Sequence, residues 1–212
     1  VFDLDGTLLN TLTDLADAGN RLCRKYGWPT HERQAYRYFV GNGIPKLVER
    51  LAPADQRTPA VLEAALADFK RDYGQHLRDT TAPYPGIPEM LAKLKANGVQ
   101  LAVFSNKADA LAKEVVKDYF GTQYFTIVRG QMTGVAPKPA AEGTNALLQA
   151  LHADPASTLY VGDSNVDVET AHNANLPCCG AVWGFRTREE LNAAGAEYLA
   201  ENSDELYDVI MK

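Results

Sequence analysis

The sequence opens with Val1-Phe2-Asp3-Leu4-Asp5-Gly6-Thr7-Leu8, a short apolar run that ends in two carboxylates one residue apart. Side chains two residues apart on an extended segment point to the same side, so we expect Asp3 and Asp5 to face one small volume. Two negative charges that close are costly unless a cation or a shared proton compensates for them. The stretch is compatible with a strand that runs into an acidic turn. It favours a strand that supplies ligands for a hard cation, with a nucleophile beside an acid/base group.

The composition excludes several classes of protein. The chain has 212 residues, of which 46% are hydrophobic and 23% are charged, enough for one large domain or a domain with an insertion. A formal net charge of -6 argues against nucleic-acid binding, and no apolar run is long enough to span a membrane. The cysteines Cys23, Cys178 and Cys179 form no metal-ligand pattern and are interpreted as reduced core residues. No signal peptide is visible, and we expect a cytoplasmic location.

Hydrophobic periodicity divides the chain into two kinds of segment. Apolar residues recur at helical spacing from Leu12 to Leu22, and further helices are predicted over residues 33–39, 44–51 and 59–77, with no strand between them. This helical block ends in the proline-rich stretch Thr80-Thr81-Ala82-Pro83-Tyr84-Pro85-Gly86, which is typical of a hinge. We therefore predict a helical domain over residues 10–83.

From residue 87 the pattern alternates between helix and strand. Helices are predicted over residues 87–96, 108–119, 140–151, 166–175, 187–194 and 203–211, and strands over residues 99–104, 125–128, 158–161, 178–182 and 197–199. Such alternation is typical of a parallel sheet covered on both faces by helices. The first strand, residues 1–4, has the same character. The sequence thus predicts an α/β fold, a Rossmann-like parallel sheet core of residues 1–9 and 84–212 with an inserted helical domain.

Three predicted strands end in polar residues. In open parallel sheets, ligands bind outside the carboxyl ends of the strands. Each end could by itself be a turn or a helix cap, because Ser, Asn and Asp favour both. Three such ends in one chain favour a shared site, and they contribute Asp3 with Asp5, then Ser105, Asn106 and Lys107, then Asp163, Ser164 and Asp167.

Lys138 completes this set of polar residues. It stands between Pro137 and Pro139, which hold the backbone extended and limit the directions in which the lysine can point. A mobile surface lysine is the simplest interpretation. Its place just before a predicted helix, where phosphate groups are often bound, favours a binding role.

The order of these signals, D-x-D, then S-N, then K-P, then G-D-S-x-x-D, resembles the four motifs of the haloacid dehalogenase superfamily, most of whose members are phosphatases. The resemblance covers the whole predicted core. It implies a haloacid dehalogenase-like fold in which Asp3 is the nucleophile and Asp5 is the general acid/base. The helical insertion after the first motif resembles the C1-type cap of this superfamily.

The resemblance also implies a cofactor and a set of binding residues. Ser105 and Lys138, with Asn106 beside them, would bind the transferring phosphoryl group. Mg²⁺ would be held by Asp3, by the main-chain carbonyl of Asp5 and by Asp163, and Asp167 would orient these ligands. An aspartate nucleophile next to a phosphate dianion needs this positive charge, because phosphoryl transfer depends on positioning and charge neutralisation.

Residues 38–50 resemble the cap loop of phosphoglycolate phosphatases, and this resemblance implies phosphoglycolate, a small phosphorylated metabolite, as the substrate. Lys46 and Arg50 lie one helical turn apart and could meet a substrate carboxylate, or both could be solvated surface charges. Glycines on either side of Asn42 would let this loop approach the mouth of the site closely.

Other functions stay open from the sequence. A β-phosphoglucomutase-like mutase would use the same core but exclude water, and another small phosphorylated metabolite could be the substrate. A dehalogenase would lack the acid/base carboxylate at Asp5, and a non-catalytic phosphate-binding module should have lost at least one of Asp3, Asp5, Lys138 and Asp163. We expect no nucleic-acid or membrane partner, and a monomer or homodimer.

Overall fold

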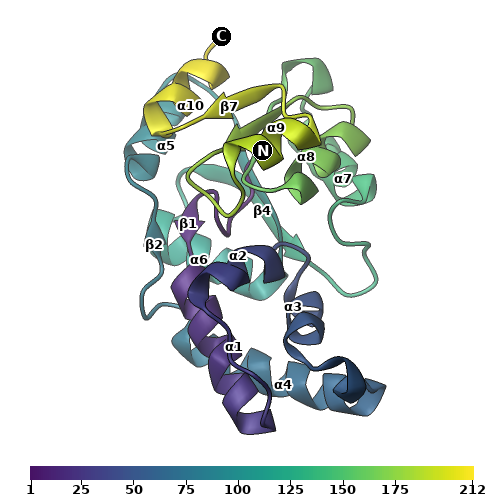
Figure 1. Cartoon of the computed structure of the whole chain (residues 1–212). Coiled ribbons are helices and arrows are strands. Elements are labelled where there is room, and N and C mark those ends of the chain that lie inside the picture. The colour runs from purple at the N-terminus through teal and green to yellow at the C-terminus, as the bar shows by residue number, and fades with distance from the viewer. The chain divides into compact units, whose positions relative to one another are not determined.

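The computed structural model describes the whole chain, residues 1–212, as two compact units (Figure 1). The α/β unit consists of Val1–Leu9 and Pro83–Lys212, and the helical unit consists of Asn10–Ala82. The chain passes from one unit to the other at two short strands, β1 (Leu9–Asn10) and β2 (Ala82–Pro83). The sequence did not predict these strands, because two residues are too few to show a period.

The helical unit is built from helices alone. They are α1 (Leu12–Tyr26), a 3-10 helix (Arg33–Ala35), α2 (Tyr36–Phe39), α3 (Ile44–Leu51), a second 3-10 helix (Ala54–Gln56) and α4 (Pro59–His76). The single helix predicted over residues 33–39 is therefore wrong in its first half, which is wound as a 3-10 turn. Helix α3 has the predicted limits, with Pro45 in its first turn, where a proline costs no hydrogen bond.

The α/β unit contains the predicted alternation of helices and strands. Its elements are α5 (Ile87–Ala96), β3 (Leu101–Ala108), α6 (Asp109–Phe120), β4 (Phe125–Gln131), α7 (Ala141–Leu151), a 3-10 helix (Pro155–Ser157), β5 (Tyr160–Gly162), α8 (Asn165–Asn173), β6 (Cys178–Ala181), α9 (Arg188–Ala194), β7 (Tyr198–Ala200) and α10 (Ser203–Ile210). Helix α8 ends two residues before the predicted limit, because Asn175 adopts the left-handed conformation (φ 56°). The parallel-sheet fold is confirmed.

The first residues of the chain join two parts of one parallel sheet. Strand β3 pairs with β4, and β6 pairs with both β5 and β7. Phe2 bridges the two groups, because it pairs in parallel with Val103 of β3 and with Val161 of β5. The order is thus β4, β3, the segment around Phe2, β5, β6 and β7. The predicted first strand is in the expected place but shorter, since the chain already bends at Leu4.

Apolar side chains from both the sheet and the helices fill the core of the α/β unit. One buried cluster joins β3, β5 and β6 to α7, α8 and α9, and it includes Phe104, Leu147, Tyr160, Val168, Cys178 and Leu191. Figure 1 shows α7, α8 and α9 together on one side of this unit and α5 with α10 on the other. The sheet is therefore covered on both faces, as parallel sheets require.

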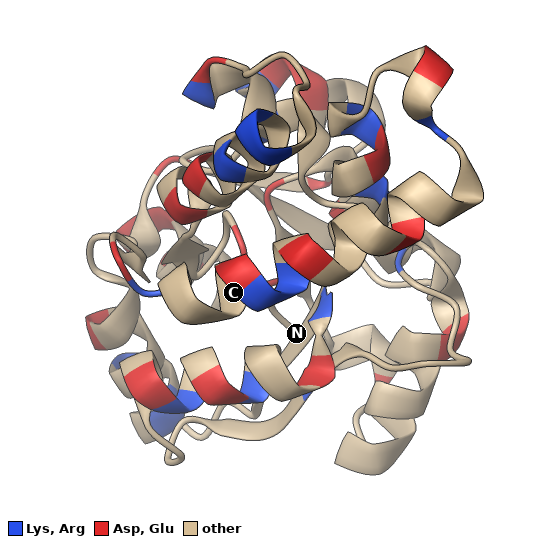
Figure 2. Ribbon diagram, turned by 90° about the horizontal axis from the view of Figure 1, so that it is seen from below, with Lys and Arg blue, Asp and Glu red and all other residues tan.

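Charged residues are spread over the surface, and the cysteines lie in the interior. Figure 2 shows Lys and Arg interspersed with Asp and Glu along the helices in view. None of the helices combines the length and the apolar character needed to cross a membrane. All three cysteines are buried and unpaired. The interpretation of the cysteines as reduced core residues agrees with this arrangement.

A buried carboxylate ties the two ends of the helical unit together. Asp14 of α1 accepts hydrogen bonds from the main-chain N–H groups of Thr80 and Thr81, each at 2.9 Å, and from both threonine hydroxyls. These donors compensate for the burial of a charge, which would otherwise be strongly unfavourable. The contact fixes where the chain leaves the helical unit.

We expect Asp14→Asn to lower the free energy of unfolding by about 2–3 kcal/mol, because one carboxylate oxygen is replaced by an NH₂ group that faces donors. Urea unfolding followed by circular dichroism measures this loss. Asp17→Asn, on an exposed position of the same helix, should change the free energy by less than about 0.5 kcal/mol. Equal effects of the two variants would contradict a stabilising role for Asp14.

Candidate functional site

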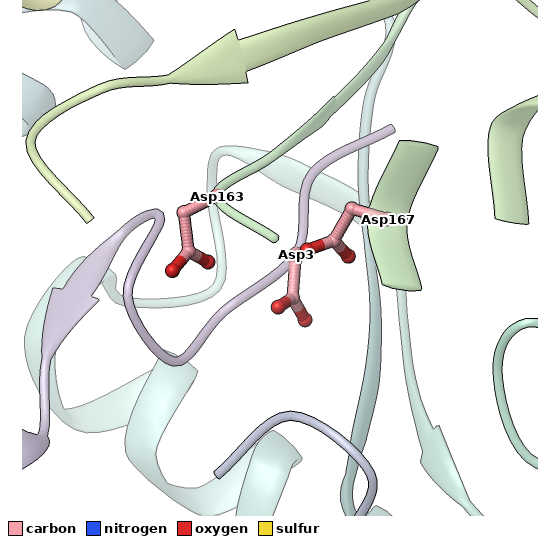
Figure 3. A group of neighbouring side chains, drawn as sticks. All are labelled: Asp3, Asp163 and Asp167. Atoms are coloured by element: carbon pink, nitrogen blue, oxygen red, sulfur yellow. The ribbon is translucent and has the colours of Figure 1, made fainter. Parts of the chain in front are cut away.

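Three carboxylates converge at the carboxyl ends of the central strands. Asp3 follows Phe2 in the first segment, Asp163 follows β5, and Asp167 lies in the first turn of α8 (Figure 3). One oxygen of each side chain lies within 4.8 Å of the others, and all three residues are buried. The structure therefore brings Asp3 together with two predicted site residues, Asp163 and Asp167, that lie at least 160 positions further along the sequence.

Lys138 places its ammonium group among these carboxylates. Its Nζ lies 2.9 Å from Asp3 Oδ1 and 2.7 Å from Asp167 Oδ1, and the residue is only 3% exposed. The amide of Asn106 fixes the main chain of this lysine, since Lys138 N–H donates to Asn106 Oδ1 (2.8 Å) and Asn106 Nδ2 donates to the Lys138 carbonyl (3.2 Å). Asn106 thus orients Lys138, a role that the sequence did not suggest.

Asp163 is held by donors that sequence reasoning missed. The Thr7 hydroxyl donates to Oδ1 (3.0 Å), and the Phe185 main-chain N–H donates to Oδ2 (2.7 Å). Gly6 and Gly184 line the same carboxylate so closely that a Cβ on either would collide with it. Gly6 also has a φ of 92°, which favours glycine. In the sequence, only Gly6-Thr7, directly after Asp5, indicates that this segment contacts Asp163.

Both oxygens of Asp167 already have partners. Oδ1 faces Lys138, and Oδ2 accepts hydrogen bonds from Ser164 N–H (3.1 Å) and from the Ser164 hydroxyl (2.7 Å). Ser164 and Asp167 thereby form the reciprocal cap of helix α8. Asp167 is therefore placed to orient its neighbours. Each oxygen of Asp163, by contrast, accepts one hydrogen bond from an uncharged donor and keeps a lone pair for a cation.

The carboxylate of Asp5 stands apart from the group of three. It faces Lys107, whose Nζ lies 3.0 Å from Oδ1 and 3.3 Å from Oδ2. Because the chain bends at Leu4, the simple alternation that would direct Asp3 and Asp5 to one volume ends there. The sequence marked Lys107 as polar at a strand end but did not assign it to the site. Its burial, with a side chain 2% exposed, follows only from the tertiary structure.

The remaining predicted site residues divide between the two units. Ser105, in the second half of β3, is buried, and its hydroxyl accepts the Lys107 N–H (3.2 Å). In the helical unit, Lys46 Nζ pairs with Glu49 (2.8 Å) at an exposed position. Arg50 donates to the Phe39 carbonyl (2.8 Å) and to Asn42 Oδ1 (2.9 Å), and so it fixes the glycine-flanked loop. Binding of substrate by Lys46 and Arg50 stays a prediction.

Burial and mutual repulsion shape the electrostatics of the site. Burial raises the pKa of Asp3 to about 7, against the opposing attraction of Lys138. Burial, then the nearby Asp167 and Asp3, raise the pKa of Asp163 well above its ordinary value. Burial alone would lower the pKa of Lys138, but Asp167 and Asp3 raise it well above the usual range. The site thus holds more negative charge than its lysine compensates, which favours binding of a cation.

The donor set fits Mg²⁺. This ion prefers oxygen ligands, and one or two carboxylates are its usual protein ligands. Asp3 Oδ1 is buried and accepts no well-aligned hydrogen bond, although Lys138 Nζ lies 2.9 Å away. Beyond this ion pair, the oxygen keeps hydrogen-bonding capacity that a cation can use.

Comparison with known proteins agrees with this geometry. The sequence matches the family of haloacid dehalogenase-like hydrolases over residues 1–181. It is 31% identical to a phosphoglycolate phosphatase of Chromobacterium violaceum, covering 99% of this chain and 94% of that protein. It is 32% identical to a phosphoglycolate phosphatase of Mesorhizobium japonicum, covering 89% and 84%. The crystal structure of a candidate phosphoglycolate phosphatase from Lactobacillus delbrueckii superposes with a TM-score of 0.93 at 28% identity, covering 99% and 96%.

In the metal-free protein, we expect Asp3→Asn to gain stability relative to the wild type as the pH rises. Folding raises the pKa of Asp3 from 3.8 to about 7, so the stability that this group contributes is complete below the lower value. That stability is lost as the pH rises through the higher value. Thermal unfolding in chelator at about pH 5 and about pH 8 measures the difference, which is a few kcal/mol at most.

Addition of Mg²⁺ should reverse this order at the higher pH, because the cation compensates for the ionised carboxylates of the wild type. A difference between wild type and Asp3→Asn that does not change with pH would contradict the burial of an ionisable Asp3 in this site.

Proposed function

We propose that this chain, a phosphatase of the haloacid dehalogenase-like hydrolase family, hydrolyses a small phosphomonoester. The reaction uses Mg²⁺ and passes through an aspartyl-phosphate. The preferred substrate is 2-phosphoglycolate. The observation that carries the mechanism is the meeting of Asp3, Asp163 and Asp167 around Lys138. A nucleophile needs this environment beside a phosphate dianion.

The first step forms a covalent intermediate on Asp3. A carboxylate oxygen of Asp3 attacks phosphorus, and the bond from phosphorus to the leaving oxygen breaks. Asp5 gives its proton to that oxygen, so the product leaves as an alcohol. Burial of Asp3 removes the water that would otherwise stabilise its charge, and the ion pair with Lys138 keeps the carboxylate in place for attack.

Neighbouring groups offset the charge of the phosphoryl oxygens. The Lys138 ammonium and the Ser105 hydroxyl bind these oxygens, which keeps phosphorus in line with Asp3. The carboxylates of Asp3 and Asp163 and the main-chain carbonyl of Asp5 would hold Mg²⁺, and Asp167 would orient them. When bound, this ion supplies positive charge against the substrate phosphate.

The second step returns the enzyme to its starting state. Water attacks phosphorus, Asp5 takes the proton from that water, and the bond from phosphorus to Asp3 breaks. Inorganic phosphate leaves, the Asp3 carboxylate is restored and Asp5 is protonated for the next cycle. One carboxylate thus serves as acid and as base, which requires that it stay in one place through both steps.

The choice of substrate rests on the relatives and on the helical unit, which we propose to act as a cap. Two of the relatives described above are phosphoglycolate phosphatases. Residues 38–50, whose sequence resembles the cap loop of such enzymes, belong to the helical unit. Lys46 binds the substrate carboxylate. Its pair with Glu49 is exposed and screened by solvent, so the lysine exchanges partners at little cost. The buried, unpaired cysteines support a reducing compartment such as the cytoplasm.

We expect Asp3→Asn to abolish phosphate release while the protein remains folded, because the amide has nearly the same shape but cannot attack phosphorus. Phosphate release from a panel of phosphorylated metabolites in Mg²⁺, with circular dichroism as the control for folding, measures this loss. Sustained turnover by this variant, after deamidation is excluded by mass spectrometry, would rule out an aspartyl-phosphate at this position. Chelator should abolish wild-type turnover, and Mg²⁺ should restore it.

For the wild type, we expect 2-phosphoglycolate to give a higher kcat/KM than sugar phosphates or p-nitrophenyl phosphate. Lys46→Met keeps the length of the side chain but removes its charge, so it should cost about 1.5–3 kcal/mol of transition-state binding for 2-phosphoglycolate. It should barely change turnover of p-nitrophenyl phosphate, which has no carboxylate.

Lys70→Met is the matched control, since Lys70 is an exposed lysine of the same unit. It should leave both substrates unaffected. Equal losses for both substrates in Lys46→Met would show that Lys46 supports the structure of the helical unit. No preference across the panel would leave the phosphatase without an assigned substrate.

A further inference from the structure

The site contains a second buried ammonium group, on Lys107. Its side chain is 2% exposed, and its Nζ contacts both oxygens of Asp5, at 3.0 and 3.3 Å. Lys138 contacts Asp3 in the same region. Each carboxylate of the opening D-x-D stretch is therefore matched by its own lysine. In the proposed mechanism, Lys138 binds the phosphoryl oxygens, whereas Lys107 has no assigned role.

An irregularity in the sheet brings Lys107 to this position. Phe104 pairs with Arg129 and Ala108 pairs with Gln131, so three residues of β3, from Ser105 to Lys107, lie opposite the single residue Gly130 of β4. All three are buried, and three residues opposite one break the regular alternation of side chains between the two faces of the sheet. A bulge of this kind redirects side chains and is common beside active sites.

Gly130 makes this bulge possible. A Cβ at position 130 would collide with the main-chain oxygen of Lys107 and with the backbone of Asp109. The Asp109 carboxylate also accepts the Gly130 N–H (3.0 Å), which fixes the backbone on the far side of the bulge. The contact between Lys107 and Asp5 thus depends on both β3, which carries Lys107, and β4, which carries Gly130.

Stability alone is a weak explanation for this ion pair. Removing two charges from water costs free energy that their attraction often only just offsets, and apolar side chains of similar size can stabilise as well. The Asp5 side chain also keeps 15% of its surface exposed, so the pair leaves this carboxylate within reach of a bound molecule. The pair holds Asp5 outside the group formed by Asp3, Asp163 and Asp167.

We propose that Lys107 is a positioning residue that holds the Asp5 carboxylate where it serves the leaving oxygen and then the attacking water. This inference rests on the proposed phosphatase mechanism. In the second step, water forms a bond to phosphorus, its proton passes to Asp5, and the bond from phosphorus to Asp3 breaks. Without Lys107, Asp5 lacks a fixed position for that transfer, while binding of the phosphoryl group by Lys138 and Ser105 is unchanged.

A double-mutant cycle tests the proposal. We expect Lys107→Met to lower kcat about 10–100-fold, less than the full contribution of acid/base catalysis because Asp5 itself remains, and to change KM less than about 2-fold. On the Asp5→Asn background, the same substitution should lower kcat less than about 2-fold, because the group that it positions is already lost. Lys107→Arg keeps the charge and should recover part of the activity.

Lys117→Met, at an exposed position of α6, is the matched control and should leave kcat unchanged. A loss of kcat that is equally large on the wild-type and Asp5→Asn backgrounds would overturn the proposal, because Lys107 would then act independently of Asp5. A rise in KM with an unchanged kcat would also overturn it and would make Lys107 a substrate-binding residue.

A second measurement separates this proposal from the proposed function. Urea unfolding midpoints of Lys107→Met, Asp5→Asn and the double variant should be non-additive if the two side chains are paired in solution. Additive midpoints would overturn the pair. If the wild type releases phosphate from no phosphomonoester, the proposed function is wrong, and so is the catalytic role of the pair of Lys107 and Asp5. The urea unfolding midpoints would still show whether these two side chains are paired.

Discussion

The site depends on the compensation of negative charge in a buried place. Asp3, Asp163 and Asp167 could not lie so close together without the ammonium of Lys138, which contacts two of them directly. With Asp5 and Lys107 included, four carboxylates face two ammonium groups. Two negative charges remain when all groups are ionised, and one divalent cation balances them. In the metal-free protein, burial first and then repulsion from neighbouring carboxylates raise the pKa values of Asp3 and Asp163.

The backbone around these charges is arranged to hold them still. Asp163 receives two hydrogen bonds, from a threonine and from a main-chain N–H that lie far apart in the sequence. Asp167 caps its own helix, and Asn106 clamps the main chain of Lys138. Nearly every functional side chain is thus fixed by a group from a different element. Such fixed geometry is what phosphoryl transfer requires, because most of its rate enhancement comes from positioning and preset charge.

Close packing of glycine against the site explains part of this order. Gly6 and Gly184 lie where any Cβ would collide with Asp163, and Gly130 lies where a Cβ would collide with the backbone beside Lys107.

The two units carry different groups of functional residues. The α/β unit carries all the groups proposed for the chemistry, and the helical unit carries the proposed specificity residues, with Asp14 fixing the exit of its chain.

The sequence by itself determined the fold class, because its signals are local. Helix α5 has the predicted limits, since Gly86 precedes it, Pro88 lies in its first turn and Asn97-Gly98 closes it. The alternation of elements was enough to predict a parallel sheet, and the carboxyl ends of its strands indicated where polar residues would meet. Asp3, Asp163, Asp167 and Lys138 could all be proposed from these patterns.

Only the tertiary structure decided which groups pair with which. The bulge that turns Lys107 toward Asp5 depends on Gly130, in another strand, and the clamp on Asp163 depends on Phe185, after β6. Strand β3 continues to Ala108, beyond its predicted end, because its pairing with β4 resumes after the bulge opposite Gly130. Periodicity describes a segment and its own neighbours, whereas a hydrogen bond between segments depends on how the sheet is assembled. The pairs of Lys107 with Asp5 and of Lys138 with Asp3 therefore form only when the strands are assembled into the sheet.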